Sequence, residues 1–160
     1  MKIKFFTVGG TIDKIYFDRK NTYEVGESLL NEILREANVG FEYEIESVLK
    51  KDSLDFTDED RLIIHGKISS EPERLIVITH GTDTMVETAR VLEDIRDKVI
   101  VLTGSMQPAR FRTSDAVFNV GSAIAAVQSK PPGIYIAMSG TIFESHRVRK
   151  NVDKGCFEEI

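Results

Sequence analysis

Cysteine, histidine and long apolar runs are scarce in this chain of 160 residues. Its single cysteine, Cys156, cannot form an internal disulfide, and its three histidines lack the spacing of a metal site. No apolar stretch approaches the roughly 20 residues that cross a bilayer. The apolar patch near the N-terminus is interrupted at Gly9-Gly10, before it reaches the length of a secretion signal. We therefore expect no bound metal, no membrane association and a cytoplasmic location.

Basic residues are too dispersed for a face that binds nucleic acid. The formal net charge is -5, and the basic residues form only short clusters such as Arg147, Arg149 and Lys150. We therefore expect no nucleic acid among the partners. With 160 residues, 41% of them hydrophobic, the chain is long enough for one ordinary core. This length predicts a single domain.

Short apolar runs alternate with segments of helical period along the chain. Four runs of branched residues are nearly continuous, which is typical of strands covered on both faces. They are Ile3–Val8, Leu75–Thr79, Val99–Thr103 and Ile134–Met138. A further strand is predicted at Phe41–Leu49, and helices at 28–37, 58–68, 85–95 and 116–127. This order predicts an α/β fold, with a doubly wound, mainly parallel sheet and helices on both faces.

Two segments carry more local predictions. The helix at 58–68 follows Thr57, a suitable N-cap, and its apolar stripe is expected to contain Leu62, Ile63 and His65. Segment 13–25 fits neither the strand nor the helix pattern, because it is polar with interspersed aromatic residues. We expect it to form a hairpin or lid beside the first glycine turn.

Two threonines follow glycine turns at the ends of apolar runs. Gly9-Gly10-Thr11 follows the first run, and His80-Gly81-Thr82-Asp83 follows the second. Ligands bind where the carboxyl ends of parallel strands meet, so both hydroxyls could face one pocket. A threonine hydroxyl is a weak nucleophile until a neighbour takes its proton, and Asp83 supplies a carboxylate beside Thr82. The alternative is that both are turn residues whose hydroxyls bond nearby backbone.

The sequences around both threonines resemble the two signature motifs of the bacterial-type L-asparaginase and glutaminase-asparaginase family. They are Thr7-Val8-Gly9-Gly10-Thr11-Ile12 and Ile78-Thr79-His80-Gly81-Thr82-Asp83-Thr84-Met85. The resemblance continues in short stretches at 52–56, 102–108, 118–119, 138–142 and 148–150. It is a resemblance to the amino-terminal, catalytic domain of the family. It implies one domain of this type at residues 1–160, with the family's smaller carboxyl-terminal domain absent.

The resemblance implies roles for the residues around the first turn. Thr11 would be the nucleophile that attacks the side-chain amide carbon of the substrate, giving an acyl-threonine ester that water hydrolyses. Tyr23 falls where the family's lid places a tyrosine that polarises this hydroxyl, although taken alone it could be an ordinary loop aromatic. Backbone N–H groups at Gly10-Thr11 and Gly81-Thr82 are candidate donors to the developing oxyanion.

The resemblance also implies roles around the second turn. Thr82 resembles the family's second essential threonine, and Lys150 matches the lysine beside it. Asp83 matches the carboxylate that binds the substrate's α-ammonium group, and Ser53 the hydroxyl that holds its α-carboxylate. A nucleophile, a base and an orienting carboxylate form a coherent set. Taken alone, Lys150 could belong to a solvated basic cluster, and Ser53 could be a cap residue.

Two further residues qualify this site. His80 has the chemistry of a general base, yet a histidine between a strand and a glycine turn is expected to be a hydrogen-bonded core residue. Leu54 stands where many family members carry a polar residue after the carboxylate-binding serine. The substrate selectivity therefore stays open.

The resemblance implies an amidohydrolase that converts L-asparagine and water to L-aspartate and ammonia, without a cofactor. One alternative is another small amide, such as L-glutamine or a D-amino-acid amide. A second alternative is a non-catalytic module that binds an amino acid. A pure binder needs no nucleophile, so the joint presence of five residues favours an enzyme. They are Thr11, Tyr23, Thr82, Asp83 and Lys150.

Association of identical chains is also expected. Family members complete each active site with side chains from a neighbouring subunit, so a homo-oligomer is implied. The helix at 116–127 is either an ordinary core helix or a two-fold interface. The residues nominated for that interface are Val117, Val120, Ala123, Ile124 and Val127.

Overall fold

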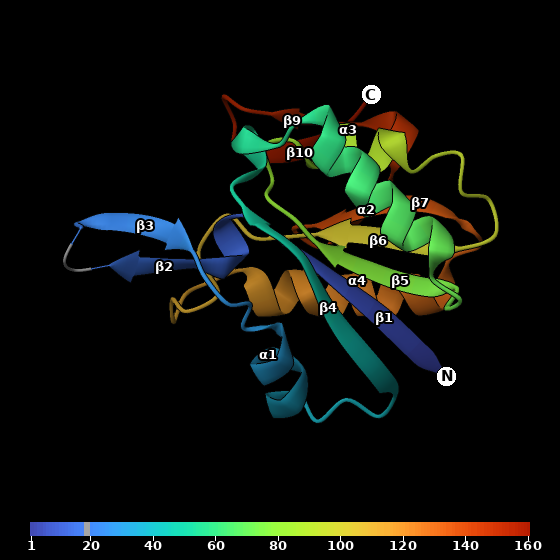
Figure 1. The fold of residues 1–160 in the computed structure, drawn as a ribbon, viewed down its shortest axis with the longest axis horizontal. Coiled ribbons are helices and arrows are strands. Elements are labelled where there is room, and N and C mark those ends of the chain that lie inside the picture. Colours follow the sequence, from blue (N-terminus) through green and yellow to red (C-terminus); the bar gives the residue numbers. More distant parts are fainter. Residues whose placement is uncertain (18–19) are drawn as a thin grey trace.

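Figure 1 shows a computed structural model of the chain, which describes residues 1–17 and 20–160. Its main sheet has six strands in the order β4-β1-β5-β6-β7-β8. Neighbouring strands are parallel, except that β7 and β8 pair antiparallel. The strands are β1 (Lys2–Gly9), β4 (Glu42–Lys51), β5 (Leu75–Thr79), β6 (Val99–Thr103), β7 (Gly133–Met138) and β8 (Thr141–Glu144). The runs predicted to be strands are confirmed.

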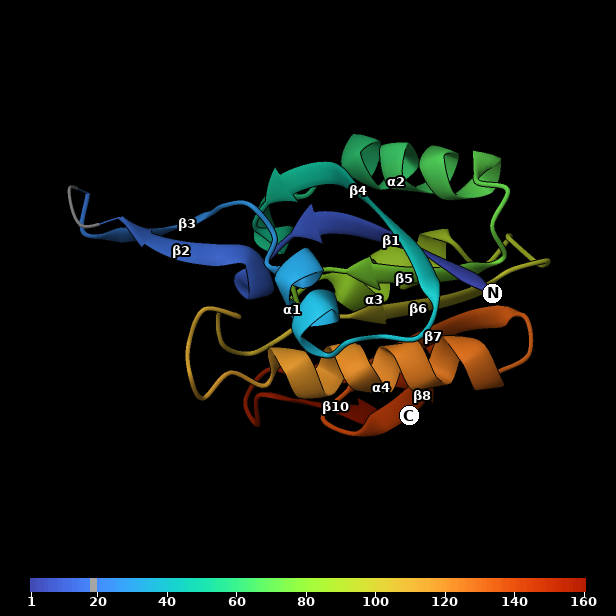
Figure 2. The ribbon, with the colours of Figure 1, turned by 90° about the horizontal axis from the view of Figure 1, so that it is seen from below.

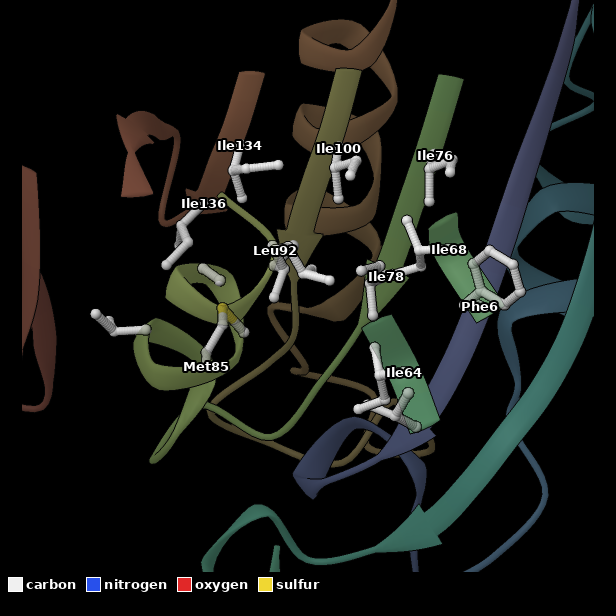
Figure 3. Packing of buried hydrophobic residues seen from close by; sticks show 14 of the residues in the cluster. Phe6, Ile64, Ile68, Ile76, Ile78, Met85, Leu92, Ile100, Ile134 and Ile136 are labelled. Carbon is white, nitrogen blue, oxygen red and sulfur yellow. The ribbon is translucent and has the colours of Figure 1, made fainter. Parts of the chain in front are cut away.

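Helices cover both faces of this sheet, as predicted (Figure 2). They are α1 (Leu30–Glu36), α2 (Asp58–Ser70), α3 (Met85–Val91) and α4 (Ala116–Ser129). Strand side chains alternate between the two faces, so Ile76 and Ile78 of β5 pack with α2 and α3, whereas Val77 packs with α1 and α4. Figure 3 shows the first of these two layers. The predicted α/β fold with a mainly parallel sheet is confirmed.

The apolar stripe of α2 differs from the prediction. Leu62 and Ile63 are 63% and 50% exposed, whereas Ile64 is fully buried. Three adjacent apolar residues leave the rotational phase of a helix ambiguous in the sequence. The N-cap prediction is confirmed, because Thr57 Oγ1 accepts a hydrogen bond from the Asp60 N–H at 3.2 Å and the Asp60 carboxylate accepts one from the Thr57 N–H at 2.9 Å. This capping box places Asp60 on the buried side, and Ile64 follows one turn later.

Two hairpins flank the main sheet. β2 (Lys14–Phe17) and β3 (Thr22–Val25) pair antiparallel and project from the body of the molecule (Figure 1), which confirms the predicted hairpin. β9 (Val148–Asn151) and β10 (Cys156–Glu159) form the second hairpin. The sequence did not predict this second hairpin, yet it carries Lys150.

Helix α4 is largely a core helix. Val120, Ala123 and Val127 are buried against the chain's own sheet, so these three nominated residues do not form a surface between chains. Val117 is 59% exposed. The homo-oligomer stays a prediction. No helix within residues 1–17 and 20–160 is long and apolar enough to cross a membrane.

Candidate active site

The two glycine turns predicted to meet at one edge of the sheet touch through their main chains. A methyl group built on Gly10 would lie 2.3 Å from both Cα and N of Gly81. Gly10 also has a φ of 92°, in the region that favours glycine. The turns therefore pack backbone against backbone, and Thr11 and Thr82 each follow directly. Only residues without a Cβ allow so close an approach.

Lys150 joins the second turn from a distant part of the chain. Its Nζ donates hydrogen bonds to Thr82 Oγ1 at 2.9 Å and to Asp83 Oδ1 at 2.5 Å. The Lys150 side chain is 13% exposed, whereas that of Arg149 beside it is 64% exposed. Because β9 alternates, Lys150 points to the site while Arg149 points to solvent. Lys150 is therefore not part of a solvated basic cluster.

Ser53 lies beside the same turn. It opens a 3₁₀ turn at Ser53–Asp55 that follows β4, and it is 1% exposed. A methyl group on Gly81 would lie 2.4 Å from Ser53 Oγ. Within the described parts of the chain, this hydroxyl has no hydrogen-bond partner. A buried hydroxyl normally has one, so Ser53 Oγ is, among the described residues, an unpaired polar atom packed against the second glycine turn.

Thr11 and Tyr23 are not joined to this cluster by side-chain hydrogen bonds between described residues. Thr11 is half-buried and opens a 3₁₀ turn at Thr11–Asp13. Tyr23 lies on β3, is 50% exposed, and contacts other aromatic rings instead. The structure thus brings Ser53, Thr82, Asp83 and Lys150 to the glycine turns, with Tyr23 on the hairpin beside them.

One of the predicted oxyanion donors is already in use. The Gly10 N–H donates to the Lys51 carbonyl at 2.9 Å, because the pairing of β1 with β4 continues to the Gly9–Lys51 step. It is therefore not free to bond a ligand. The predicted N–H donors that have no such backbone bond across residues 1–17 and 20–160 are those of Thr11, Gly81 and Thr82.

A cleft of about 460 Å³ lies between the β2–β3 hairpin and the end of β4. Its lining includes Lys14, Tyr23, Lys51 and Asp52. A second hollow, of about 370 Å³, lies around Gly133 at the start of β7, which is the opposite edge of the sheet. The first cleft lies nearer to the glycine turns and contains Tyr23, but its lining includes none of Thr11, Ser53, Thr82, Asp83 and Lys150. Within the described ranges, no three His, Cys, Asp or Glu residues cluster as metal ligands do.

His80 is a core residue, in agreement with the interpretation of its sequence position. It is fully buried, its Nδ1 lies 2.7 Å from the Gly81 carbonyl oxygen, and its Nε2 lies 2.8 Å from Thr88 Oγ1. A carbonyl oxygen only accepts, so Nδ1 carries the proton and Nε2 accepts from Thr88. Burial lowers the pKa of His80 to about 4. The neutral ring fixes the shape of the second turn.

Asp13, two residues after Thr11, is also buried, but its pKa is raised whereas that of His80 is lowered. It is 4% exposed, and its Oδ1 lacks a hydrogen-bond partner among the described residues. Burial raises the pKa of this carboxyl group to about 6. The sequence pattern does not indicate this burial, because Asp13 lies in the polar segment 13–25 that is predicted to form a hairpin or lid.

His80 and Asp13 make stability depend on pH in opposite directions, so Asp13→Asn should reveal the dependence that is due to His80. Between pH 6.5 and 4 the unfolded chain protonates His80 before the folded chain does, so stability falls with acid. Asp13 has the opposite effect between pH 6 and 4. There the folded chain protonates Asp13 before the unfolded chain does, so the contribution of Asp13 to stability rises as the pH falls. Removing Asp13 should therefore steepen the acid loss by about 2 kcal/mol between pH 7 and 4. Urea unfolding across this range would measure it.

The exposed Asp153 provides a matched control. Asp153→Asn should leave the curve of stability against pH parallel to that of the wild type. A parallel curve for Asp13→Asn as well would contradict the prediction.

Comparisons with known proteins agree with the arrangement of these turns. The sequence matches the family described as "Asparaginase, N-terminal" over residues 2–156. The chain belongs to the asparaginase family. The resemblance seen in the sequence motifs is confirmed, and the family match extends over α4 and the β9 strand that carries Lys150.

Relatives of this asparaginase-family chain are about twice its length. An L-asparaginase from Thermococcus kodakarensis is 34% identical over 159 residues, which is 94% of this chain and 48% of that protein. The structure of the thermostable L-asparaginase from Thermococcus kodakarensis has a TM-score of 0.84 at 29% identity, covering 100% of this chain and 51% of that one. That of a probable cytoplasmic L-asparaginase from Campylobacter jejuni has a TM-score of 0.79 at 30% identity, covering 99% and 51%. The chain thus spans about half the length of the relatives it matches.

Proposed function

We propose that this chain hydrolyses L-asparagine to L-aspartate and ammonia, with residues 1–160 acting as the catalytic domain. The observation that carries the proposal is the hydrogen-bonded set of Lys150, Thr82 and Asp83 beside two touching glycine turns. A lysine at 2.9 Å from a buried threonine hydroxyl is at the distance that proton transfer requires. Membership of the asparaginase family supports the same reaction.

In this proposal the reaction has two steps. The Thr11 oxygen attacks the side-chain amide carbon, the C–N bond breaks, and ammonia leaves with the proton of the hydroxyl, so that an acyl-threonine ester remains. Water then attacks the ester, which releases L-aspartate and returns the proton to Thr11. The N–H groups of Thr11 and Thr82 are the proposed donors to the oxyanion of each tetrahedral intermediate.

The remaining residues bind and orient the substrate. Asp83 is 39% exposed at its side chain, so it has surface left for the α-ammonium group of an amino acid. Ser53, whose buried hydroxyl is unpartnered within the described residues, would donate to the α-carboxylate. Tyr23 would close the cleft and polarise Thr11, and Thr82 with Lys150 would transfer the protons. These roles match those that the resemblance implied.

Location and assembly belong to the same proposal. We propose a cytoplasmic homo-oligomer that contacts neither membranes nor nucleic acid. The relative from Campylobacter jejuni is named as a probable cytoplasmic enzyme, which supports that location. Light scattering, with turnover per chain measured on dilution, would test the assembly.

Ammonia release from purified protein tests the reaction. L-asparagine is expected to be turned over without added metal or cofactor, and the panel should include L-glutamine and the D-forms of both. Leu54, which is 70% exposed where many family members carry a polar residue, is the reason to include these alternatives. Binding of an amino acid without ammonia release from any amide would favour the non-catalytic module and contradict the enzyme.

Thr11→Ala should abolish turnover while the fold is kept. The half-buried hydroxyl makes no side-chain hydrogen bond to the described residues, so its loss should change the unfolding free energy by less than about 1 kcal/mol. Turnover should fall by at least about 10³-fold, because the nucleophile is gone. Thr11→Ser keeps a hydroxyl and should retain measurable activity. Equal ammonia release by Thr11→Ala and the wild type would exclude Thr11 as the nucleophile.

A further inference from the structure

Phe111, which lies outside the sequence motifs, contacts Tyr23 from the loop between β6 and α4. The two ring centroids are 6.1 Å apart with an interplanar angle of 66°, an edge-to-face arrangement. On its other side, Tyr23 packs against Tyr16 of β2 at 5.2 Å. The three rings form a row from the loop across β3 to β2. Tyr23 is 50% exposed and Phe111 is 41% exposed, so neither is held by burial in a core.

The loop that carries Phe111 is fixed by hydrogen bonds. The Asp115 carboxylate accepts from the N–H groups of Met106 at 3.0 Å and Gln107 at 3.1 Å. The Ala109 N–H donates to the Ile12 carbonyl at 3.0 Å, one residue after Thr11. Because this loop is bonded to the Thr11 turn itself, Phe111 has a defined position relative to Thr11.

The hairpin that carries Tyr23 is fixed at its base. Lys14 Nζ forms an ion pair with Asp52 Oδ2 at 2.6 Å, and the Gly26 N–H donates to the Asp13 carbonyl at 2.8 Å. Beyond this base the hairpin extends away from the main sheet (Figure 1). A two-stranded ribbon is only marginally stable alone. The position of Tyr23 therefore depends on contacts along the side of the hairpin, and the ring of Phe111 makes one.

We propose that Phe111 is a positioning residue, which holds Tyr23 and the β2–β3 hairpin in place relative to the Thr11 turn. The inference rests on the proposed function, in which Tyr23 assists Thr11. An aromatic pair of this geometry shifts an equilibrium by about 2- to 12-fold. Loss of the Phe111 ring should therefore lower the ratio of molecules with the hairpin docked to molecules with it undocked by a factor in this range.

A double-mutant cycle tests whether Phe111 acts through Tyr23. Phe111→Ala should lower kcat/KM for L-asparagine by about 3- to 10-fold, and Phe111→Tyr, which keeps the ring edge, should restore most of it. In a Tyr23→Ala background, adding Phe111→Ala should change kcat/KM by less than about 2-fold. An equal loss in both backgrounds would show that Phe111 acts independently of Tyr23, and would overturn the proposal.

Phe17 is the matched control. It is 40% exposed, lies on the same hairpin, and is outside the row of three rings. Phe17→Ala should leave kcat/KM within about 2-fold of the wild type. If Phe17→Ala instead lowered kcat/KM as much as Phe111→Ala does, a general loosening of this region would explain both, and the specific role of Phe111 would be rejected.

Hydrogen exchange separates this inference from the proposed function. Amides of β3 should exchange about 2- to 12-fold faster in Phe111→Ala than in the wild type, whereas the exchange of β5 and β6 stays unchanged. This readout needs no substrate. If the wild type released no ammonia from any amide, the proposed function would fail while faster β3 exchange still established the contact. Unchanged β3 exchange would overturn the positioning role even in an active enzyme.

Discussion

Thr82→Val and Lys150→Met are each expected to lower turnover of L-asparagine by about 10³-fold, with the double variant scarcely worse than either single one. The physical reason is the 2.9 Å hydrogen bond from Lys150 Nζ to Thr82 Oγ1, which makes the two side chains one proton-transfer unit. Once either partner is lost, the other has nothing left to contribute to the transition state. Single-turnover ammonia release would measure the chemical step directly.

Controls separate this chemistry from a loss of folding. Thr82→Val keeps the shape of a side chain that is 5% exposed and removes its hydroxyl, so a loss of turnover at an unchanged unfolding free energy would be due to the hydroxyl. Lys154→Met removes a lysine with a 71% exposed side chain from the same β9–β10 hairpin and should retain full activity. If the fold-losses of turnover of the two single variants multiplied in the double variant, Lys150 would act on the reaction independently of Thr82. This result would contradict the prediction that the two side chains form one proton-transfer unit.

The sequence predicted the parts of the site that follow directly from local pattern. Each glycine turn comes at the end of a buried strand. Because β1 and β5 pair in parallel, their carboxyl ends, and with them the two turns, lie side by side. The contact between Gly10 and Gly81 is the consequence. Ser53 follows the same logic, because it comes directly after β4, the neighbour of β1 on the other side.

Lys150 could not be placed by such reasoning. It lies 68 residues from Thr82 along the chain, on a hairpin whose alternation is short and interrupted by charges. From composition alone it looked like a solvated cation, and only the family motif indicated otherwise. The aromatic contact of Phe111 with Tyr23 was missed for a similar reason, since side-chain contacts between two loops have no periodic signal in a single sequence.

The phase of α2 illustrates a third limit. Adjacent apolar residues at 62–64 are compatible with several buried faces, and the sequence stripe selected Leu62 and Ile63. In the structure Ile64 and Ile68, four residues apart, are both fully buried against the sheet and share that face with Asp60 of the capping box. The choice between these faces is made by packing against the sheet, which local sequence pattern does not contain.

Gly10→Ala is expected to destabilise the fold by at least about 3 kcal/mol and to abolish activity. The new methyl group would lie 2.3 Å from the main chain of Gly81, and no side-chain movement relieves a contact with backbone. The residue would also be held at a φ of 92°, which costs about 1 to 3 kcal/mol for a residue with a Cβ. Thermal unfolding should show a melting temperature lower by roughly 6 to 12 °C for a domain of this size.

Glycines in open surroundings provide the control. Nothing lies within 4 Å of a methyl group built on Gly121 of α4, so Gly121→Ala should be neutral or raise stability by about 0.5 to 1 kcal/mol. If Gly10→Ala were as stable and as active as Gly121→Ala, the two turns would not touch as described.

Gly81→Ala tests the same contact from its other side, and it has a specific rescue. A methyl group there would lie 2.4 Å from Ser53 Oγ and 2.6 Å from Ser53 Cβ, both atoms of a side chain that can be removed. Ser53→Gly should therefore recover much of the stability that Gly81→Ala loses, whereas it should not rescue Gly10→Ala, whose clash is with main chain. Activity should return in neither double variant, because the proposed ligand of the α-carboxylate is then missing. Recovery of Gly10→Ala by Ser53→Gly would contradict the backbone contact, since it would mean that a side chain, and not the Gly81 main chain, occupies the space.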